Sequence, residues 1–275
     1  MQKVIYLSEL DLYIKELEKP VVSYIKEGQI ETYESFDTYT IAAFDWYNLF
    51  DENAKPDQIL IYIDRNDIFF ICENADAYKA ANSYFEEGMT NDLVLYSFLK
   101  NTMKGGMRIM EKMETEVYSL EDEVNNGSKE GLSEQIFAMR DRIRHVNRYY
   151  EQIEFLIQEF CENDNYMISE NEIRNFENLK NRAIHFNTMA AHLRDYIMQV
   201  REAYKAQIGI EQNNLMRVFT MVTSIFMPLT LIVGWYGMNV KMPETTWEYG
   251  YIFVAVLCVV VCGIWMYVFR RKKWL

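Results

Sequence analysis

Cysteine and proline are both scarce in this chain of 275 residues, with four of each. The cysteines are Cys72, Cys161, Cys258 and Cys262, and no two of them have the CxxC spacing of a zinc ribbon or a redox motif. They are also too few and too far apart for a disulfide framework, so we expect a reducing compartment. The scarcity of proline, together with 50% hydrophobic residues, excludes a disordered or collagen-like chain.

Positive charge is also in short supply. The 28 Lys and Arg residues are outnumbered by 41 Asp and Glu residues, and the resulting net charge of −13 argues against a nucleic-acid partner. The sequence contains no P-loop, GxSxG, HExxH or dinucleotide fingerprint, so we expect neither an enzyme nor a bound cofactor. The N-terminal segment carries acidic residues where a signal peptide needs an apolar core, which predicts a cytosolic N-terminus.

Charge is absent altogether from two segments near the C-terminus, residues 218–236 and 251–269. Each is about 19 residues long, enough for a helix to cross a hydrocarbon core of roughly 30 Å. Basic residues 270–273 follow the second segment, whereas the connector holds Lys241 against Glu244 and Glu248. The positive-inside rule therefore predicts two membrane spans with both termini cytosolic and the connector outside. A buried helix of a soluble domain is the alternative for the first segment, and the flanking charges argue against it.

The residues before the spans predict an α+β architecture. Residues 1–90 contain short β-rich runs, including ILIYID and DIFFIC separated by Arg65 and Asn66, which predict a cytosolic α/β domain with a hairpin. Residues 91–169 have apolar residues at helical spacing and predict an antiparallel pair, one long helix from about Asn91 to the break at 125–127 and a second from Leu132 to Phe160.

A third long helix is predicted to join the cytosolic part to the membrane. Between 170 and 236 the only strong helix breaker is Pro228, so a stalk over 170–217 continues into the first span at 218–236. An outer loop at 237–250, a second span at 251–269 and a basic cytosolic tail at 270–275 complete the predicted organisation.

Polar and small residues gather on one side of the first span. At 100° per residue, about a third of the helix circumference carries Asn213, Met216, Thr220, Thr223, Ser224, Met227, Thr230 and Gly234. Such a stripe lines either a close helix–helix contact or a water-filled path. Two spans cannot surround a channel, so a wet stripe requires an oligomer with the first span innermost. The span has no carboxylate, which favours a hydrated cation over a dehydrated divalent ion.

The string IFMPLTLIVGWYGMN, followed by MPE, an aromatic residue, YGY and a second span that ends in KKWL, resembles the CorA family of metal-ion transporters. The resemblance is strong over about residues 190–275 and rests on topology alone for residues 1–170. It implies a homopentameric funnel in the cytoplasmic membrane and passive, potential-driven influx of Mg²⁺. The alternatives are transport of Co²⁺, Ni²⁺ or Zn²⁺ by the same fold, or a membrane-anchored metal sensor that does not conduct.

The resemblance also assigns roles at the outer mouth and in the pore. Gly237, Met238 and Asn239 correspond to the selectivity ring, with the Asn239 amide facing the hydration shell of Mg²⁺. Gly237 and Asn239 also suit a simple helix cap. Met216 and Phe219 correspond to a hydrophobic gate, although the helical wheel turns Phe219 away from the polar stripe.

The chain departs from the family pattern at the regulatory cytosolic Mg²⁺ site. Members of the family often sense Mg²⁺ between subunits through a stalk carboxylate that aligns with Asn178, where this chain has an amide. Glu177 is adjacent but points 100° away around the helix. We therefore expect that this sensor site is lost.

Overall fold

The structure is a computed structural model that describes residues 1–13, 17, 21, 22, 25, 33–51, 55–85, 88–127, 131–238, 247–272 and 274. The chain divides into two compact units, Met1–Glu202 and Ala203–Leu275. The elements in chain order are β1 (Gln2–Tyr6), the 3₁₀ helix η1 (Leu7–Tyr13), β2 (Tyr33–Ser35), β3 (Tyr39–Trp46), β4 (Asp57–Asp64), β5 (Ile68–Cys72), α2 (Ala75–Tyr84), α3 (Asn91–Thr102), α4 (Gly106–Asn125), α5 (Leu132–Glu162), α6 (Glu170–Tyr236) and α7 (Gly250–Arg271).

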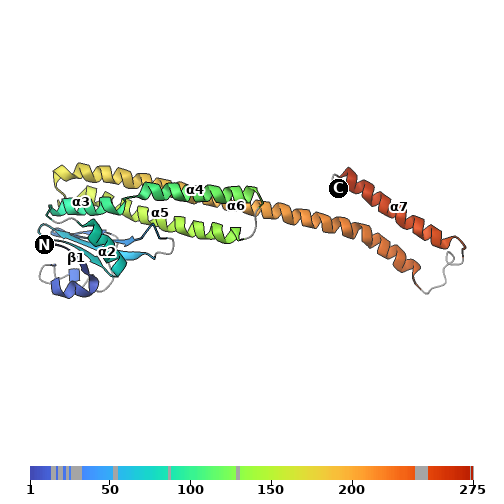
Figure 1. Cartoon of the computed structure of the whole chain (residues 1–275), viewed down its shortest axis with the longest axis horizontal. Helices are drawn as coiled ribbons and strands as arrows, with labels where there is room; N and C mark the ends of the chain where they lie inside the picture. Colours follow the sequence, from blue (N-terminus) through green and yellow to red (C-terminus); the bar gives the residue numbers. More distant parts are fainter. Residues whose placement is uncertain are drawn as a thin grey trace. The chain divides into compact units, whose positions relative to one another are not determined.

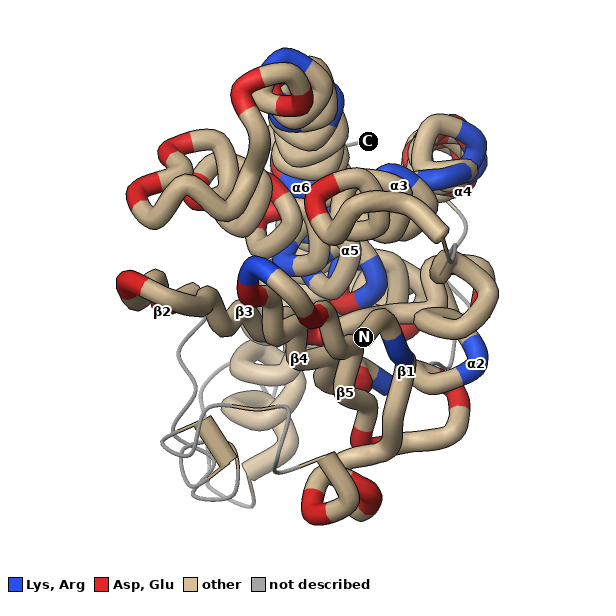
Figure 2. The backbone as a smooth tube through the Cα atoms, turned by 90° about the vertical axis from the view of Figure 1, so that its left-hand side faces the viewer, with Lys and Arg blue, Asp and Glu red and all other residues tan. Residues whose placement is uncertain are grey.

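A five-stranded sheet with the order β1-β5-β4-β3-β2 forms the base of the first unit (Figure 2). The predicted hairpin is confirmed, because β4 and β5 pair antiparallel with Ile63 opposite Ile68. Its turn is closed by the Asp64 carboxylate, which accepts hydrogen bonds from the backbone N–H groups of Asn66 (2.7 Å) and Asp67 (2.6 Å). The edge strand β1 pairs parallel to β5.

Both faces of the sheet are covered, which is why the strand β5 is buried along its whole length. One face carries Tyr62, Phe69 and Ile71 in a core that also includes Leu10 of η1. The other face packs against helices, and the Phe70 ring stacks on Phe98 of α3 at 4.1 Å. Figure 2 shows α3, α5 and α6 on this side of the sheet.

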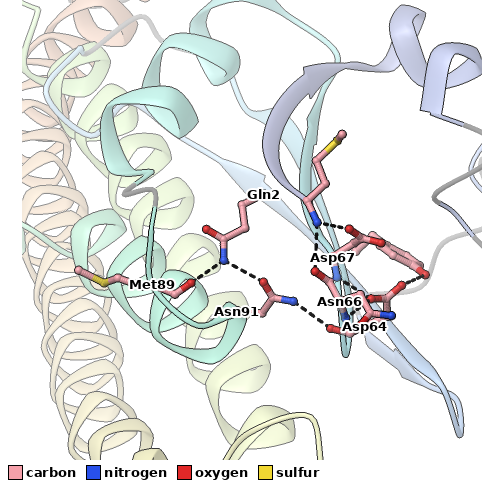
Figure 3. A network of polar contacts seen from close by, with 8 residues as sticks. Gln2, Asp64, Asn66, Asp67, Met89 and Asn91 are labelled. Carbon is pink, nitrogen blue, oxygen red and sulfur yellow. Dashed lines mark hydrogen bonds and ion pairs between the residues drawn. The ribbon is translucent and has the colours of Figure 1, made fainter.

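A polar network joins the edge of the sheet to the start of α3 (Figure 3). The Gln2 side-chain amide donates to the Met89 carbonyl (2.7 Å) and to the Asn91 side chain (3.0 Å), and Asn91 in turn donates to the Asp64 carbonyl (3.1 Å). The Met1 ammonium group pairs with Asp67. These contacts fix the direction in which the chain leaves the sheet for the helices.

The prediction of one long helix from about Asn91 to residue 125 is wrong, because the chain breaks between α3 and α4. Gly105 has φ = 82°, a left-handed conformation that glycine adopts without strain. Gly106 then begins α4 in close contact with two other helices, since a Cβ there would meet the Tyr150 hydroxyl and lie 3.2 Å from the Phe186 ring. The apolar spacing runs through the break, so periodicity alone does not reveal it.

Helices α4 and α5 lie beside the first part of α6 (Figure 1). The Arg142 guanidinium on α5 pairs with Glu116 on α4 (2.8 Å), and the Tyr196 hydroxyl on α6 donates to Glu121 on α4. The helix from Leu132 and the uninterrupted helix from Glu170 to Tyr236 are both observed, the former ending at Glu162. Helices α4 and α5 therefore support the stretch of α6 that belongs to the first unit.

The buried carboxylate of Asp92 holds the start of α6 against the start of α3. It accepts hydrogen bonds from the Ser169 hydroxyl (2.6 Å), the Ser169 N–H (3.2 Å), the Leu93 N–H (2.9 Å) and the Thr90 hydroxyl. Ser169 precedes α6, and its carbonyl accepts the first hydrogen bonds of that helix, from Glu172 and Ile173. One side chain thereby fixes where the long helix begins.

Candidate functional site

The polar stripe predicted on the first span lies on α6 in the second unit. Positions 213, 216, 220, 223, 227, 230 and 234 alternate spacings of three and four residues and are all exposed in the single chain. Met216 and Met227 are 62% and 68% exposed, whereas Met221, Ile225, Pro228 and Ile232 on another side of the helix are only partly exposed. Ser224 is also partly covered, and Phe219 is 66% exposed.

Three threonine hydroxyls on this stripe bond to the helix that carries them. Thr220, Thr223 and Thr230 each donate to the backbone carbonyl four residues earlier, all at 2.8 Å. The hydroxyl hydrogen is used within the helix, so the Oγ1 lone pairs remain available as acceptors. Water molecules around a metal cation direct their hydrogens outward, and such acceptors suit them. The sequence identified these residues but not the direction of their hydrogen bonds.

The helix ends at the predicted mouth. The N–H of Gly237 donates to the Val233 carbonyl (2.8 Å), and a Cβ at this position would lie 2.9 Å from the same oxygen, so the backbone leaves no room for a larger residue. The N–H of Met238 donates to the Trp235 carbonyl (3.3 Å), and its side chain is 51% exposed.

Two of the predicted loop residues, Asn239 and Glu244, lie outside the described residues. Glu248 is exposed in the short turn before α7, where the Gly250 N–H donates to the Trp247 carbonyl (3.0 Å). The structure thus describes Gly237 and Met238 of the expected selectivity ring and the last residues of the loop.

A groove of about 1000 Å³ lies along α6 near this end. Its wall runs from Val222 to Met238 and includes four stripe residues, Thr223, Met227, Thr230 and Gly234. The remaining wall is apolar. In the single chain this surface is open, although it combines hydroxyl acceptors with side chains that avoid water.

A family model described as "CorA-like Mg2+ transporter protein" matches residues 17–271. The chain belongs to the CorA family. Curated relatives include the "Cobalt/magnesium transport protein CorA" of Thermotoga maritima, 25% identical over 67% of this chain and 53% of that protein. The protein of the same name from Methanocaldococcus jannaschii is 26% identical over 82% of this chain and 74% of that protein. The chain thus spans about half the length of the first of these relatives.

Solved structures share the fold of this CorA-family chain. The complete CorA magnesium transporter of Methanocaldococcus jannaschii superposes with a TM-score of 0.77 at 21% identity and covers 100% of this chain and 91% of that one. The full-length CmaX protein gives a TM-score of 0.76 at 16% identity, covering 99% and 88%. The predicted α+β class is confirmed: an N-terminal sheet domain, a long helix and a C-terminal apolar helix.

The residues considered for a regulatory site are both on the surface of α6. Glu177 and Asn178 are exposed, and Glu177 lies near the Cys161 thiol of α5. Burial, the largest cause, raises the pKa of Cys161; the positive charge of Lys180 opposes this, and the smaller effects of Glu177 and Glu162 raise the pKa. Among the described residues of this one chain, no group of three or more His, Cys, Asp or Glu side chains could hold a metal ion.

Proposed function

We propose that this CorA-family chain conducts hydrated Mg²⁺ passively across the cytoplasmic membrane into the cell. The observation that carries the proposal is the uncharged stripe of outward-facing acceptors on α6. This helix and α7 are both long and apolar enough to cross a membrane. Family membership supplies the transporter class. No nucleotide motif is present, which agrees with a protein that is not an enzyme.

The chemistry of the stripe suits Mg²⁺ with its water shell. Mg²⁺ loses its coordinated waters reluctantly and takes carboxylate oxygens when it does. Residues 218–236 contain no Asp, Glu, His or Lys. The hydroxyls of Thr220, Thr223 and Thr230 instead present lone pairs to which bound waters can donate. Proline at 228 lacks an N–H, so the Ser224 carbonyl has no partner at that position and is a further acceptor.

A conducting path requires several copies of the chain, because two helices cannot enclose one. We propose the homopentamer that the family resemblance implies, with α6 of each copy innermost and α7 facing lipid. The exposed stripe and the open groove on α6 support this arrangement. In an assembly, neighbouring copies would cover the apolar side chains, and a water-filled axis would hydrate the acceptors. Helix α7 is apolar on all sides, with Val259 71% and Ile264 56% exposed.

The proposed ion path has two constrictions. At the outer mouth, Gly237, Met238 and Asn239 form the selectivity ring, and the strict need for glycine after the last turn of α6 supports a fixed backbone there. Deeper in the path, Met216 and Phe219 form the hydrophobic gate, and their high exposure on α6 supports this role. The membrane potential drives the ion, at about 4.6 kcal/mol per 100 mV for a divalent charge.

Co²⁺ is the second candidate cargo. Two of the relatives carry the name "Cobalt/magnesium transport protein CorA", which favours Co²⁺ over Ni²⁺ or Zn²⁺ as the alternative. A path that binds water shells through neutral acceptors discriminates weakly between hydrated divalent ions. The transported ion is therefore identified by measuring how strongly each ion competes for uptake.

The test is Mg²⁺ entry into proteoliposomes that contain a magnesium-sensitive dye. We expect influx that increases with an inside-negative potential and that is lost in Asn239→Ala, while the oligomer stays intact. Asn171→Ala, an exposed position at the start of α6, serves as the matched control and should leave influx unchanged. Co²⁺, Ni²⁺ and Zn²⁺ are added as competitors. Normal Mg²⁺ flux in Asn239→Ala would remove the selectivity assignment, and no influx of any ion would support the sensor instead.

A further inference from the structure

Helix α7 ends in a cluster of aromatic side chains. Phe269 is 2% exposed, whereas Val259 and Tyr267 on the same helix are 71% and 68% exposed. Two tryptophans cover it. The Trp265 ring lies 5.5 Å from the Phe269 ring, and the Trp274 ring lies 5.9 Å away and nearly parallel, at 5°. Trp274 comes after the end of the helix, so the tail turns back onto it.

Hydrogen bonds hold the tail in this position. The Trp274 N–H donates to the Phe269 carbonyl (3.0 Å), and the Lys272 N–H donates to the Val268 carbonyl (3.0 Å). The last turn of a helix leaves carbonyls without partners, which is costly next to hydrocarbon. The tail supplies two of the missing donors. The described tail is therefore a folded cap on α7.

A second aromatic cluster marks the other end of α7. The Trp247 ring lies 6.2 Å from the rings of both Tyr249 and Phe253. Tyr249 and Phe269 are about 20 residues apart, which at 1.5 Å per residue is roughly 30 Å, the thickness of a hydrocarbon core. Tryptophan and tyrosine favour the boundary between hydrocarbon and headgroups. The folded tail thus lies at the level of the lipid headgroups on the C-terminal side of α7.

Three described cations lie at this level, and no described anion of the chain pairs with them. Arg270, Arg271 and Lys272 are all exposed, and no ion pair joins any of them to another described residue. Helix α7 contains no acidic residue. The Lys272 ammonium group lies 5.7 Å from the centre of the Trp274 ring, a cation–π distance that ties one of the charges to the folded tail.

We propose that the folded tail is a binding site for the headgroup of an anionic phospholipid. Arg270 and Arg271 present planar guanidinium groups that can donate two hydrogen bonds to a phosphate, and Lys272 adds a third charge. Trp274 covers Phe269 and keeps Lys272 beside the helix end. The proposal needs only that α7 crosses a membrane, and not that the chain conducts an ion.

The occupant is a lipid and not a free phosphate, because the three charges adjoin an apolar helix that needs acyl chains around it. The Trp274 ring lies beside the Lys272 charge and the Trp265 ring lies more than one helical turn earlier, where glycerol and ester groups of a lipid would contact them. A free anion would interact with the three charges but would make no favourable contact with the apolar helix or the tryptophan rings.

The test measures lipid selectivity directly. The full chain is reconstituted in phosphatidylcholine vesicles with a trace of spin-labelled phosphatidylglycerol or spin-labelled phosphatidylcholine, and electron paramagnetic resonance gives the fraction of each label immobilised by the protein. We expect phosphatidylglycerol to associate more tightly, by about fivefold for each basic residue that engages it. The triple variant Arg270→Gln, Arg271→Gln, Lys272→Gln should lose most of this preference, because only Lys273 remains of the basic residues 270–273.

The charge-matched control replaces three exposed basic residues of the first unit, Arg65, Lys79 and Lys104, by Gln. It should keep the preference for phosphatidylglycerol. Trp274→Ala should reduce the preference by uncovering Phe269, and Trp274→Phe should restore it. Equal association of both lipids with the native chain, or an unchanged preference in the triple variant or in Trp274→Ala, would overturn the proposal. So would displacement of the labelled lipid by soluble glycerol phosphate at constant ionic strength.

Discussion

The hydroxyls of Thr220, Thr223 and Thr230 each donate their hydrogen to a carbonyl of α6, which leaves the oxygen lone pairs able to accept hydrogen bonds. Replacing Thr223 by Val keeps the shape and removes the oxygen. We expect Mg²⁺ flux in proteoliposomes to fall on the order of tenfold, the effect of losing one hydrogen bond to a charged species per subunit. Thr223→Ser should retain most of the flux.

Thr188 provides a control for this prediction on the same helix. It makes the same 2.8 Å hydrogen bond to the carbonyl four residues earlier, but it lies in the first unit, outside the membrane-spanning stretch. Thr188→Val should leave flux unchanged. An equal loss of flux in Thr188→Val and Thr223→Val would mean that the threonines act through helix geometry and not as acceptors.

Asp92 makes the stability of the first unit depend on pH. Burial raises its pKa, but the hydrogen bonds donated by Ser169, Thr90 and Leu93 together outweigh burial and leave the pKa below its usual range. A carboxylate with a lowered folded pKa stabilises the protein above its unfolded pKa of about 4. This stabilisation is lost as the pH falls through the folded value.

Asp92→Asn should therefore destabilise the chain near neutral pH, by about 1–3 kcal/mol for the donors left without partners. The difference from the native protein should shrink as the pH falls below about 4. Thermal unfolding of the detergent-solubilised chain across a pH series measures both effects. Asp37→Asn, at an exposed position, is the control. A pH-independent difference between native and Asp92→Asn would contradict the assignment.

At the level of single residues, the sequence predicted the composition of the stripe but not its bonding. The spacing of Asn213 to Gly234 places those side chains on one side of any helix. The direction of a hydroxyl hydrogen depends on the rotamer, which a sequence does not specify. The roles of Asn239 and Glu244 stay predictions, since both lie outside the described residues.

The junction between α3 and α4 contains two adjacent glycines, and each is required for a different reason. Gly105 is needed for its left-handed φ of 82°, and Gly106 for the space taken by Tyr150 and Phe186. Gly106→Ala should destabilise the chain by about 1–3 kcal/mol through overpacking. Gly209→Ala is the matched control in α6, where a Cβ meets nothing within 4 Å, and it should be neutral or stabilising by about 0.5–1 kcal/mol.

A second substitution distinguishes overpacking from other causes. The Tyr150 hydroxyl is buried without a hydrogen-bond partner among the described residues. Tyr150→Phe should therefore be nearly neutral or stabilising by itself, and it should relieve part of the cost of Gly106→Ala. Thermal unfolding of the four combinations gives the coupling. Strict additivity would show that the new methyl group does not contact Tyr150.

At the level of elements, long uniform segments were predicted well and tight junctions were not. The helices from Leu132 and from Glu170 follow from apolar spacing that is bounded by clear breakers. The break at Gly105 lies inside a continuous apolar pattern, and only the adjacent glycines at 105 and 106 mark it in the sequence. The contact of Gly106 with Tyr150 of α5 and Phe186 of α6 exists only in the folded chain. The parallel pairing of β1 with β5 is likewise a long-range contact.

At the scale of the whole molecule, the polar stripe and the groove of α6 are uncovered in the single chain. The stripe and groove of α6 combine acceptors with apolar side chains such as Phe226, which is 61% exposed. Lipid would satisfy the apolar part and leave the acceptors without donors, whereas water would do the reverse. Neighbouring copies of α6 around a water-filled axis satisfy both, which is the physical reason to expect an oligomer.

The proposed assembly also raises the question of regulation by internal Mg²⁺, and Asn178 allows a direct test. If the family's sensor needs a carboxylate at this exposed position of α6, internal Mg²⁺ should inhibit the native chain only weakly. Asn178→Asp should then increase sensitivity to internal Mg²⁺ by roughly tenfold, the effect of one added charge-assisted contact. Flux into proteoliposomes preloaded with graded Mg²⁺ measures this.

Asn171→Asp adds the same charge two turns earlier on the same face of α6, so it controls for a general effect of the field. A gain in sensitivity confined to Asn178→Asp would locate the sensor at that turn of the stalk. Equal gains in both variants would show that added negative charge, and not a specific ligand, attracts the ion. Strong inhibition of the native chain that Glu177→Gln removes would contradict the predicted loss and place the sensor one residue earlier, where the carboxylate already lies beside α5.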